Sequence, residues 1–253
     1  MNQPLEKFAV LSDIHSNIYA LKAVVEDAKN RGVTTLINLG DILYGPIAPR
    51  ATYDYLMTLT AVTISGNQDR QIYQATQAEI DANPTMQFIL NDLGNEPLIW
   101  MKQLPFDKQV TPEIYACHGT PGDDLVYLLE ETRSGHPELR TEQEITRLLN
   151  GVTSPVILCG HTHIPRCVSL RTGQLIINPG SVGLPAYTDD TPHLHSMQTY
   201  SSLASYAILE KTTAGTWQAG FHKVQYDVQS AINAALKRGR KDWEHFLSTG
   251  RGL

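Results

Sequence analysis

Short apolar runs alternate with helical patterns along the first third of the chain. The runs at 8–11, 35–39 and 61–64 have the length and composition of buried strands. Between the first two, apolar residues at 18, 21, 24, 25 and 28 line one face of a helix that ends near Gly32. A second helix is predicted over 53–59. This alternation predicts an α/β fold built on a parallel sheet.

The rest of the chain continues the pattern with more strands. Residues 69–95 read as helical with a break at Pro84, because proline is tolerated only in a first helical turn. Thr141 and Glu144 form a capping-box pattern that begins another helix. Further strands are predicted at 113–117, 156–159, 205–209 and 217–224, a hairpin at 166–178, and a last helix over 227–238. We expect one domain over 1–253, with a long functional or mobile loop at about 184–202 and a loose tail at 250–253.

Composition narrows the class of protein. The chain has 253 residues, 42% hydrophobic and 18% charged, with a net charge of −6 and no basic run, so nucleic acid is an unlikely partner. No apolar run approaches the roughly 20 residues that span a bilayer, and the start of the sequence lacks a secretory signal pattern. Three cysteines do not form a disulfide framework. We expect a cytoplasmic protein without membrane contact.

Potential metal ligands follow five of the apolar runs. In open α/β sheets, ligands bind beyond the carboxyl ends of strands, so these side chains are expected to converge on one crevice. Two carboxylates, one amide oxygen and four imidazoles suit borderline divalent ions, and the set is too large for one catalytic ion. Two ions that share a carboxylate are the simplest interpretation. The seven residues are Asp13, His15, Asp41, Asn67, His118, His161 and His163.

In this order and spacing, the motifs resemble those of the calcineurin-like metallophosphoesterases. The resemblance rests on Asp13-Ile14-His15, Gly40-Asp41, Gly66-Asn67-Gln68-Asp69, His118 and Gly160-His161-Thr162-His163. It implies a sandwich of two β-sheets flanked by helices, in four layers. It also implies one metal on Asp13, His15, Asp41 and His163, and a second on Asp41, Asn67, His118 and His161. The flanking sequences look like small bacterial members, some of which are described as diadenosine tetraphosphate hydrolases or broad phosphodiesterases.

The implied activity is hydrolysis of a phosphodiester, phosphomonoester or phosphoanhydride by a hydroxide that two metals activate. Manganese is the first expectation, with iron, zinc, nickel, cobalt or magnesium as alternatives, and the substrate is a small phosphorylated molecule such as a nucleotide. Gln68 stands where many members have histidine, and a neutral amide cannot protonate a leaving oxygen. One alternative is therefore a phosphate or nucleotide sensor that keeps the metals. A second is a dinuclear hydrolase of amides or lactones, which shares the ligand types but has a characteristic ligand spacing that is absent here. The oligomeric state is left open.

Further residues belong to the candidate site. The catalytic set is Asp41, Asn67, Gln68 and Asp69, of which Asp69 either orients Gln68 or, as we favour, caps the following helix. Tyr44 either contacts substrate or packs beside a proline. His193 and His195 have metal-like spacing within the polar loop and are candidates for substrate binding there, although exposed loop histidines are commoner. Cys117 and Cys159 are read as core side chains, and Arg70, Arg166 and Arg171 as surface salt bridges.

Overall fold

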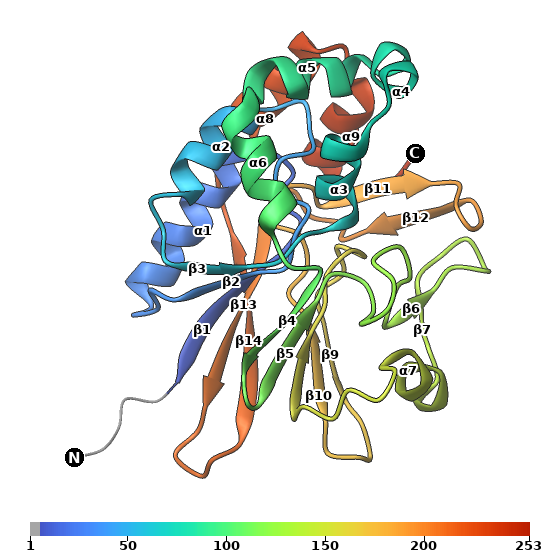
Figure 1. Ribbon diagram of the computed structural model, residues 1–253. Coiled ribbons are helices and arrows are strands. Elements are labelled where there is room, and N and C mark those ends of the chain that lie inside the picture. The colour runs from blue at the N-terminus through green and yellow to red at the C-terminus, as the bar shows by residue number, and fades with distance from the viewer. Residues whose placement is uncertain (1–5) are drawn as a thin grey trace.

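A computed structural model describes residues 6–253 and places the main strands in two five-stranded sheets (Figure 1). In the first sheet, three parallel strands pair in sequence order and two antiparallel strands extend the sheet beyond β1. Its order is β14 (Trp217–Val224), β13 (Ala204–Lys211), β1 (Lys7–Leu11), β2 (Leu36–Asn38) and β3 (Ala61–Thr63). The parallel part is the sheet that the alternating pattern predicts.

The second sheet has three parallel strands at its centre and an antiparallel strand at each edge. Its order is β4 (Asp107–Thr111), β5 (Ile114–Cys117), β8 (Val156–Leu158), β10 (Leu175–Asn178) and β9 (Arg166–Ser169). The predicted hairpin is confirmed, since β9 pairs antiparallel with β10 and Val168 lies opposite Ile176.

The two sheets pack face to face through apolar side chains. Val10 and Ile37 of the first sheet share one buried cluster with Ile114, Val156 and others of the second, all fully or nearly fully buried. Burying each such side chain contributes roughly 1.5–3 kcal/mol, which makes this interface the central core. The expected sandwich of two mixed sheets is therefore confirmed.

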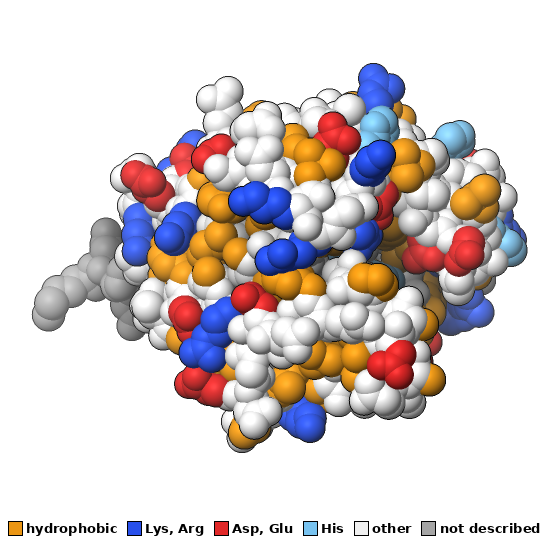
Figure 2. All heavy atoms as spheres, turned by 90° about the horizontal axis from the view of Figure 1, so that it is seen from above, with side chains coloured by type: hydrophobic (Ala, Val, Ile, Leu, Met, Phe, Trp, Pro, Cys, Tyr) orange, Lys and Arg blue, Asp and Glu red, His pale blue; other side chains and the backbone are white. Residues whose placement is uncertain are grey.

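Helices form the outer layers. Those that begin in the first half of the chain cover the outer face of the first sheet, with their apolar residues in a second core cluster. They are α1 (Ile18–Asn30), α2 (Pro49–Leu56), α3 (Asn67–Gln74), α4 (Gln77–Ala82), α5 (Pro84–Leu93) and α6 (Asn95–Gln103). On the other side, α7 (Glu142–Leu148) packs on the second sheet through Ile145. Seen from above, the helical face mixes basic and acidic side chains with small hydrophobic patches (Figure 2).

Helix boundaries follow local capping chemistry. Thr141 accepts a hydrogen bond from the Glu144 amide, and the Glu144 carboxylate accepts one from the Thr141 amide, which confirms the predicted capping box. Pro84 occupies the first turn of α5, as expected. The prediction of one continuous helix from 69 to Pro84 was wrong, because Thr76 and Glu79 form another capping box that begins α4. The helix predicted over 53–59 instead begins at Pro49 and ends at Leu56.

The segment at 184–202 is ordered, and the prediction of a long loop was wrong there. Its two four-residue strands, β11 (Ala186–Asp189) and β12 (His195–Gln198), pair as an antiparallel hairpin. After α8 (Val228–Lys237), the chain forms α9 (Lys241–Thr249), which was not predicted and which contacts β11 (Figure 1).

The last residues are also fixed, contrary to the expected loose tail. The Gly252 amide donates to Gln198 Oε1 at 3.2 Å and the Leu253 amide to Thr188 Oγ1 at 2.8 Å. A further small pair is formed by β6 (Glu130–Glu131) and β7 (Glu138–Leu139). Within residues 6–253, no helix has both the length and the apolar character needed to cross a membrane.

Candidate metal centre

The loops that follow five strands bring the seven predicted ligands together. Asp13 and His15 follow β1, Asp41 follows β2, and Asn67 opens α3 directly after β3. The second sheet contributes His118 after β5, and His161 and His163 after β8. The side chains form two clusters of three, in each of which the candidate ligand atoms lie within 4.8 Å of one another.

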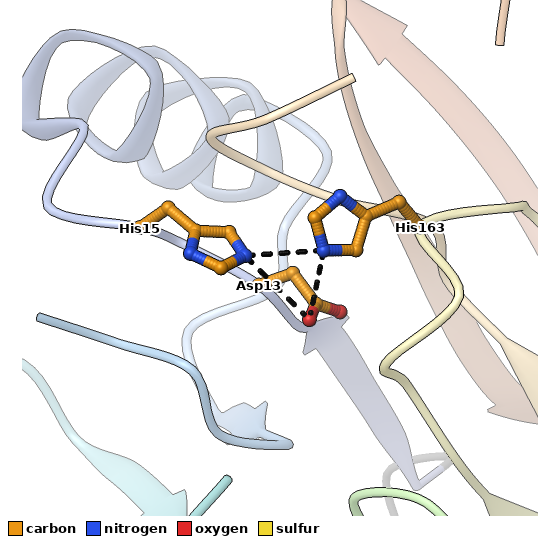
Figure 3. Close-up of side chains that lie close together, drawn as sticks. All are labelled: Asp13, His15 and His163. Atoms are coloured by element: carbon orange, nitrogen blue, oxygen red, sulfur yellow. Dashed lines mark hydrogen bonds and ion pairs between the residues drawn. The ribbon is translucent and has the colours of Figure 1, made fainter. Parts of the chain in front are cut away.

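The first cluster consists of Asp13, His15 and His163, which turn toward one another in Figure 3. His163 Nε2 lies 3.2 Å from Asp13 Oδ1 and 3.1 Å from His15 Nε2. All three residues are buried, with at most 3% of their surface exposed. The cluster therefore presents two nitrogens and one carboxylate oxygen to a common point.

The second cluster consists of Asp41, His118 and His161, with Asn67 beside it. His118 Nε2 lies 3.5 Å from Asp41 Oδ2 and 3.0 Å from Asn67 Oδ1. The negative charge of Asp41 acts to raise the pKa of His118 and also that of His15 in the first cluster. The Asp41 carboxylate is thus electrostatically coupled to both clusters.

Hydrogen bonds to the backbone define which ring nitrogen faces each cluster. Nδ1 of His15, His118 and His163 lies 3.1, 2.8 and 2.6 Å from the carbonyl oxygens of Tyr44, Leu39 and Leu184, respectively. A carbonyl only accepts hydrogen bonds, so each Nδ1 donates a proton to its carbonyl and each ring turns its Nε2 toward its cluster.

This arrangement fits a bound cation. The Nε2 atoms of His15 and His163 face each other at 3.1 Å, and the lowered pKa of His15 leaves its Nε2 with a free lone pair at neutral pH. Asp13 Oδ1 is buried beside them without a hydrogen-bond donor. Two imidazole nitrogens and a carboxylate oxygen are a suitable donor set for a borderline divalent ion. The residues present therefore fit the metal that the sequence predicts.

The pKa values of the cluster residues favour the ligating protonation states. Burial, aided by the charge of a neighbouring imidazole, lowers the pKa of His15 to about 4 and that of His161 to about 3. Burial also opposes ionisation of Asp13, but the surrounding histidines outweigh it and hold the pKa of Asp13 below its usual range. At neutral pH, these two imidazoles are neutral and the Asp13 carboxylate is ionised, as metal binding requires.

His118 differs from the other imidazoles in charge. Burial works against its protonation, but the Asp41 carboxylate outweighs burial and raises the pKa of His118 to about 10. His118 in turn keeps the pKa of Asp41 lowered against the effect of burial. A divalent ion at the second cluster would replace this proton as the partner of Asp41.

The backbone at the ligands adopts an uncommon conformation. Left-handed φ angles at non-glycine residues cost about 1–3 kcal/mol each and cluster at functional sites. Five of the candidate ligands have them: Asp13 (56°), His15 (48°), Asp41 (54°), His161 (69°) and His163 (61°). Amide hydrogen bonds hold part of this geometry, since the Asp13 amide donates to the Gly40 carbonyl and the His15 amide to the Asp41 carbonyl, each at 3.0 Å.

A cleft of about 360 Å³ opens onto the centre. His15, Asp41, Asn67, His161 and His163 lie at its base. Its walls include β11, which lies in the 184–202 segment that the sequence connected with substrate binding, and the start of α9, which was not predicted. The further lining residues are Tyr44, Gln68, Leu184, Tyr187, Thr188, Asp189, Arg240, Asp242, Trp243, Phe246 and Leu253.

The other predicted catalytic and substrate residues take different positions. Gln68 lines the cleft. Its backbone N–H donates to Asp41 Oδ1 at 2.8 Å, and its side-chain oxygen has no hydrogen-bond partner. Asp69 is buried beneath the centre and accepts hydrogen bonds from the amides of Gly66 and Ile42. Burial and the charge of Asp41 raise the pKa of Asp69 to about 7. Asp69 therefore connects the loops that follow β2 and β3, and it caps α3, as favoured above.

His193 and His195 differ in how far they are buried. His193 is exposed, whereas His195 is 2% exposed and lies 2.9 Å from the hydroxyl of Tyr127, a residue that the sequence did not single out. Neither histidine lines the cleft within the described part of the chain.

The arginines and cysteines singled out in the sequence take different surroundings. Arg70 and Arg166 form ion pairs with Asp124 and Glu130, whose carboxylates are buried, so for these two the prediction of a surface salt bridge was wrong. Arg171 pairs with Glu142 at the surface. Cys117 and Cys159 are buried in the core of the second sheet, and burial raises the pKa of each thiol well above its ordinary value.

Comparison with known proteins defines the family. Residues 7–201 match the calcineurin-like phosphoesterase superfamily domain, and the chain belongs to this family. It is 26% identical to an uncharacterized protein of Methanocaldococcus jannaschii over 93% of this chain and 94% of that protein. A crystal structure of a metallophosphoesterase from Sphaerobacter thermophilus is 22% identical and superposes with a TM-score of 0.74 over 98% of this chain and all of that one. YfcE, a phosphoesterase from E. coli, is 19% identical over 87% of this chain and all of that one, with a TM-score of 0.43.

The family assignment agrees with the architecture and the site. The two mixed sheets flanked by helices are the metallophosphoesterase fold. Members of this family bind divalent metals, and the two buried clusters of His and Asp are the candidate sites for them here. The family also implies a phosphoester substrate.

Proposed function

We propose that this protein is a hydrolase of small phosphoric esters or anhydrides, such as nucleotides, and that it uses water activated by two divalent ions. The observation that carries the proposal is the pairing of two buried clusters at the base of one cleft. In the first cluster, the Nε2 atoms of two buried imidazoles face each other at 3.1 Å beside a carboxylate. A cation is the ligand that satisfies all three groups.

The proposed ligands fall into two sets that share Asp41. One ion is held by Asp13, His15, Asp41 and His163, and the other by Asp41, Asn67, His118 and His161. The electrostatic coupling of Asp41 to His15 and to His118 supports its place in both sets. When bound, such ions lower the pKa of water and offset negative charge on a phosphoryl group. We propose manganese as the first metal to test.

The remaining residues of the cleft bind and orient the substrate. Of the lysine and arginine side chains within residues 6–253, Arg240 lines the cleft. Asp242 and Thr85 hold its guanidinium, with Nε–Oδ1 and Nη1–Oγ1 distances of 2.8 Å each, and leave further N–H groups free for phosphoryl oxygens. The Tyr44 hydroxyl accepts a hydrogen bond from Asn83, so its own proton is available to the substrate.

Gln68 restricts which substrates react fast. Its side chain lines the cleft beside the ligands but has no titratable proton to give to a leaving oxygen. Substrates with good leaving groups, such as phosphoanhydrides and aryl esters, depend least on such a proton. We therefore propose that they are the preferred class.

Turnover before and after metal addition tests this function. Protein stripped with a chelator is assayed on bis-p-nitrophenyl phosphate, then again after manganese is added, with an Asp41→Asn variant as control. We expect metal to restore hydrolysis in the wild type and not in the variant. Bound metal without turnover on any ester would contradict the proposal and favour a phosphate or nucleotide sensor, which is the function that Gln68 makes the main alternative.

A further inference from the structure

His161 is held in place differently from the other three candidate histidine ligands. His15, His118 and His163 are each oriented by a hydrogen bond from Nδ1 to a backbone carbonyl. Among the hydrogen bonds of residues 6–253, none reaches the ring of His161. Its backbone is fixed instead, because its amide lies 3.2 Å from Asp13 Oδ2 and its carbonyl accepts from the Tyr187 hydroxyl at 3.0 Å.

Two tyrosines pack against the histidines that follow β8. The Tyr127 ring lies 4.7 Å from the His161 ring, and the Tyr187 ring lies 4.6 Å from the His163 ring, measured between centroids. These contacts place aromatic surface against the side of each imidazole. They limit the rotation of the His161 ring, which lacks a hydrogen bond of its own.

A chain of polar contacts joins these tyrosines to the hairpin. The hydroxyl oxygens of Tyr187 and Tyr127 are 3.0 Å apart, and the Tyr127 hydroxyl lies 2.9 Å from His195 Nε2. His195 Nδ1 donates to the His193 carbonyl at 2.6 Å, and its Nε2 pairs with the Tyr127 hydroxyl. The single proton of the Tyr187 hydroxyl has two acceptors at 3.0 Å, the Tyr127 hydroxyl oxygen and the carbonyl of His161.

We propose that Tyr187, Tyr127 and His195 are positioning residues that hold His161 in its metal-binding orientation, with the β11–β12 hairpin as their support. The inference rests on the proposed function only in requiring a metal at the second cluster. The φ angle of +69° at His161 is unfavourable for a side chain of this kind, and the hydrogen bond from Tyr187 to its carbonyl helps to maintain it. His195 acts at the far end by fixing Tyr127.

Metal titration of the stripped protein tests this role without reference to turnover. Cobalt and manganese binding is measured by calorimetry, and the ligand geometry by the visible absorption of bound cobalt, for the wild type, Tyr187→Phe, His195→Ala and His195→Gln. Loss of a residue that supports a ligand typically weakens metal binding by about 10–100-fold. We expect Tyr187→Phe and His195→Ala to weaken one of two binding steps by this factor and to alter the cobalt spectrum.

The conservative variant and a remote control separate positioning from general stability. A glutamine at 195 can still accept from Tyr127, so His195→Gln is expected to restore most of the affinity that His195→Ala loses. Tyr206→Phe removes another buried hydroxyl, which donates to Asp27 at 2.7 Å, and is expected to leave both steps unchanged.

Two results would overturn the proposal. One is unchanged metal affinity in Tyr187→Phe and His195→Ala. The other is equal weakening of both binding steps together with a lower unfolding midpoint. A wild type that binds two ions but hydrolyses no ester would refute the proposed function alone, since the effect on the second binding step is still measured.

Discussion

Replacing Gly66 by alanine tests how closely the ligand loops must approach each other. Gly66 lies directly before Asn67, and a Cβ atom there would stand 2.2 Å from Asp41 Oδ1 and 2.4 Å from the Asp41 amide nitrogen. The φ angle of −97° at Gly66 is open to any residue. The substitution therefore probes space alone and introduces no backbone strain of its own.

The size of the effect follows from this distance. Ordinary van der Waals contact between a Cβ and another heavy atom begins at 3.4 Å. The added Cβ would lie 2.2 Å from Asp41 Oδ1, so Asp41 or the Gly66 loop must move by 1.2 Å. A displacement of about 1 Å at a catalytic group can cost about 100-fold in rate. Overpacking of this kind also lowers the free energy of unfolding by about 1–3 kcal/mol. Gly66→Ala is thus expected to fold and to lose about 99% of kcat/KM.

Two measurements on the same protein check this prediction. Hydrolysis of bis-p-nitrophenyl phosphate with manganese gives kcat/KM, and urea unfolding gives the stability. Gly122→Ala is the matched control, since the nearest atom to its Cβ is Asn150 Nδ2 at 3.8 Å, and we expect its kcat/KM within about twofold of the wild type. Wild-type kcat/KM and metal affinity in Gly66→Ala would refute the reasoning that Asp41 must stay in place.

Three further predictions concern the ligands and the cleft. His161→Ala and Asp41→Asn are each expected to leave below about 1% of wild-type turnover at saturating manganese, and retained turnover in either would contradict the ligand assignment. Gln68→His is expected to flatten the dependence of rate on leaving-group pKa, because an imidazolium can protonate the departing oxygen; the same dependence in both proteins would contradict the role given to Gln68. Arg240→Gln is expected to raise KM about tenfold or more through loss of a charged hydrogen bond to phosphate, whereas Arg238→Gln, whose guanidinium lies over the Phe88 ring, should leave KM unchanged. Equal changes in the two arginine variants would show that Arg240 does not bind substrate.

The sequence predicted the sandwich and the position of the ligands because both depend on local patterns. Each ligand follows an apolar strand within a few residues, so the order of the strands brings Asp13, Asp41 and His161 to one end of the sheets. The helix beginning at Thr141 was likewise predictable, because its capping box lies within four consecutive residues. In these cases the signal is local, and the prediction and the structure agree.

Two elements near the site escaped prediction for different reasons. The two strands of the 186–198 hairpin are Ala-Tyr-Thr-Asp and His-Ser-Met-Gln, in which polar residues predominate, so no apolar run marks them as it marks β10. In α9, by contrast, Trp243, Phe246 and Leu247 are buried at helical spacing, so a signal for this helix was present in the sequence.

Contacts between segments that are far apart in the sequence could not be predicted from sequence patterns. Tyr127 and His195 are 68 positions apart, and no spacing rule connects them. The same holds for the placement of Arg240 in the wall of the cleft, which depends on how α9 packs against β11. Such contacts depend on tertiary packing, and the structure was needed to find them.

Anomalous diffraction from crystals grown with manganese locates bound ions without reference to activity. We expect two peaks about 3.5–4 Å apart beside the cleft. One should lie against His15 and His163, the other against His118 and His161, and Asp41 should contact both. A single peak, no peak, or two peaks of which Asp41 contacts only one would contradict the two-ion centre.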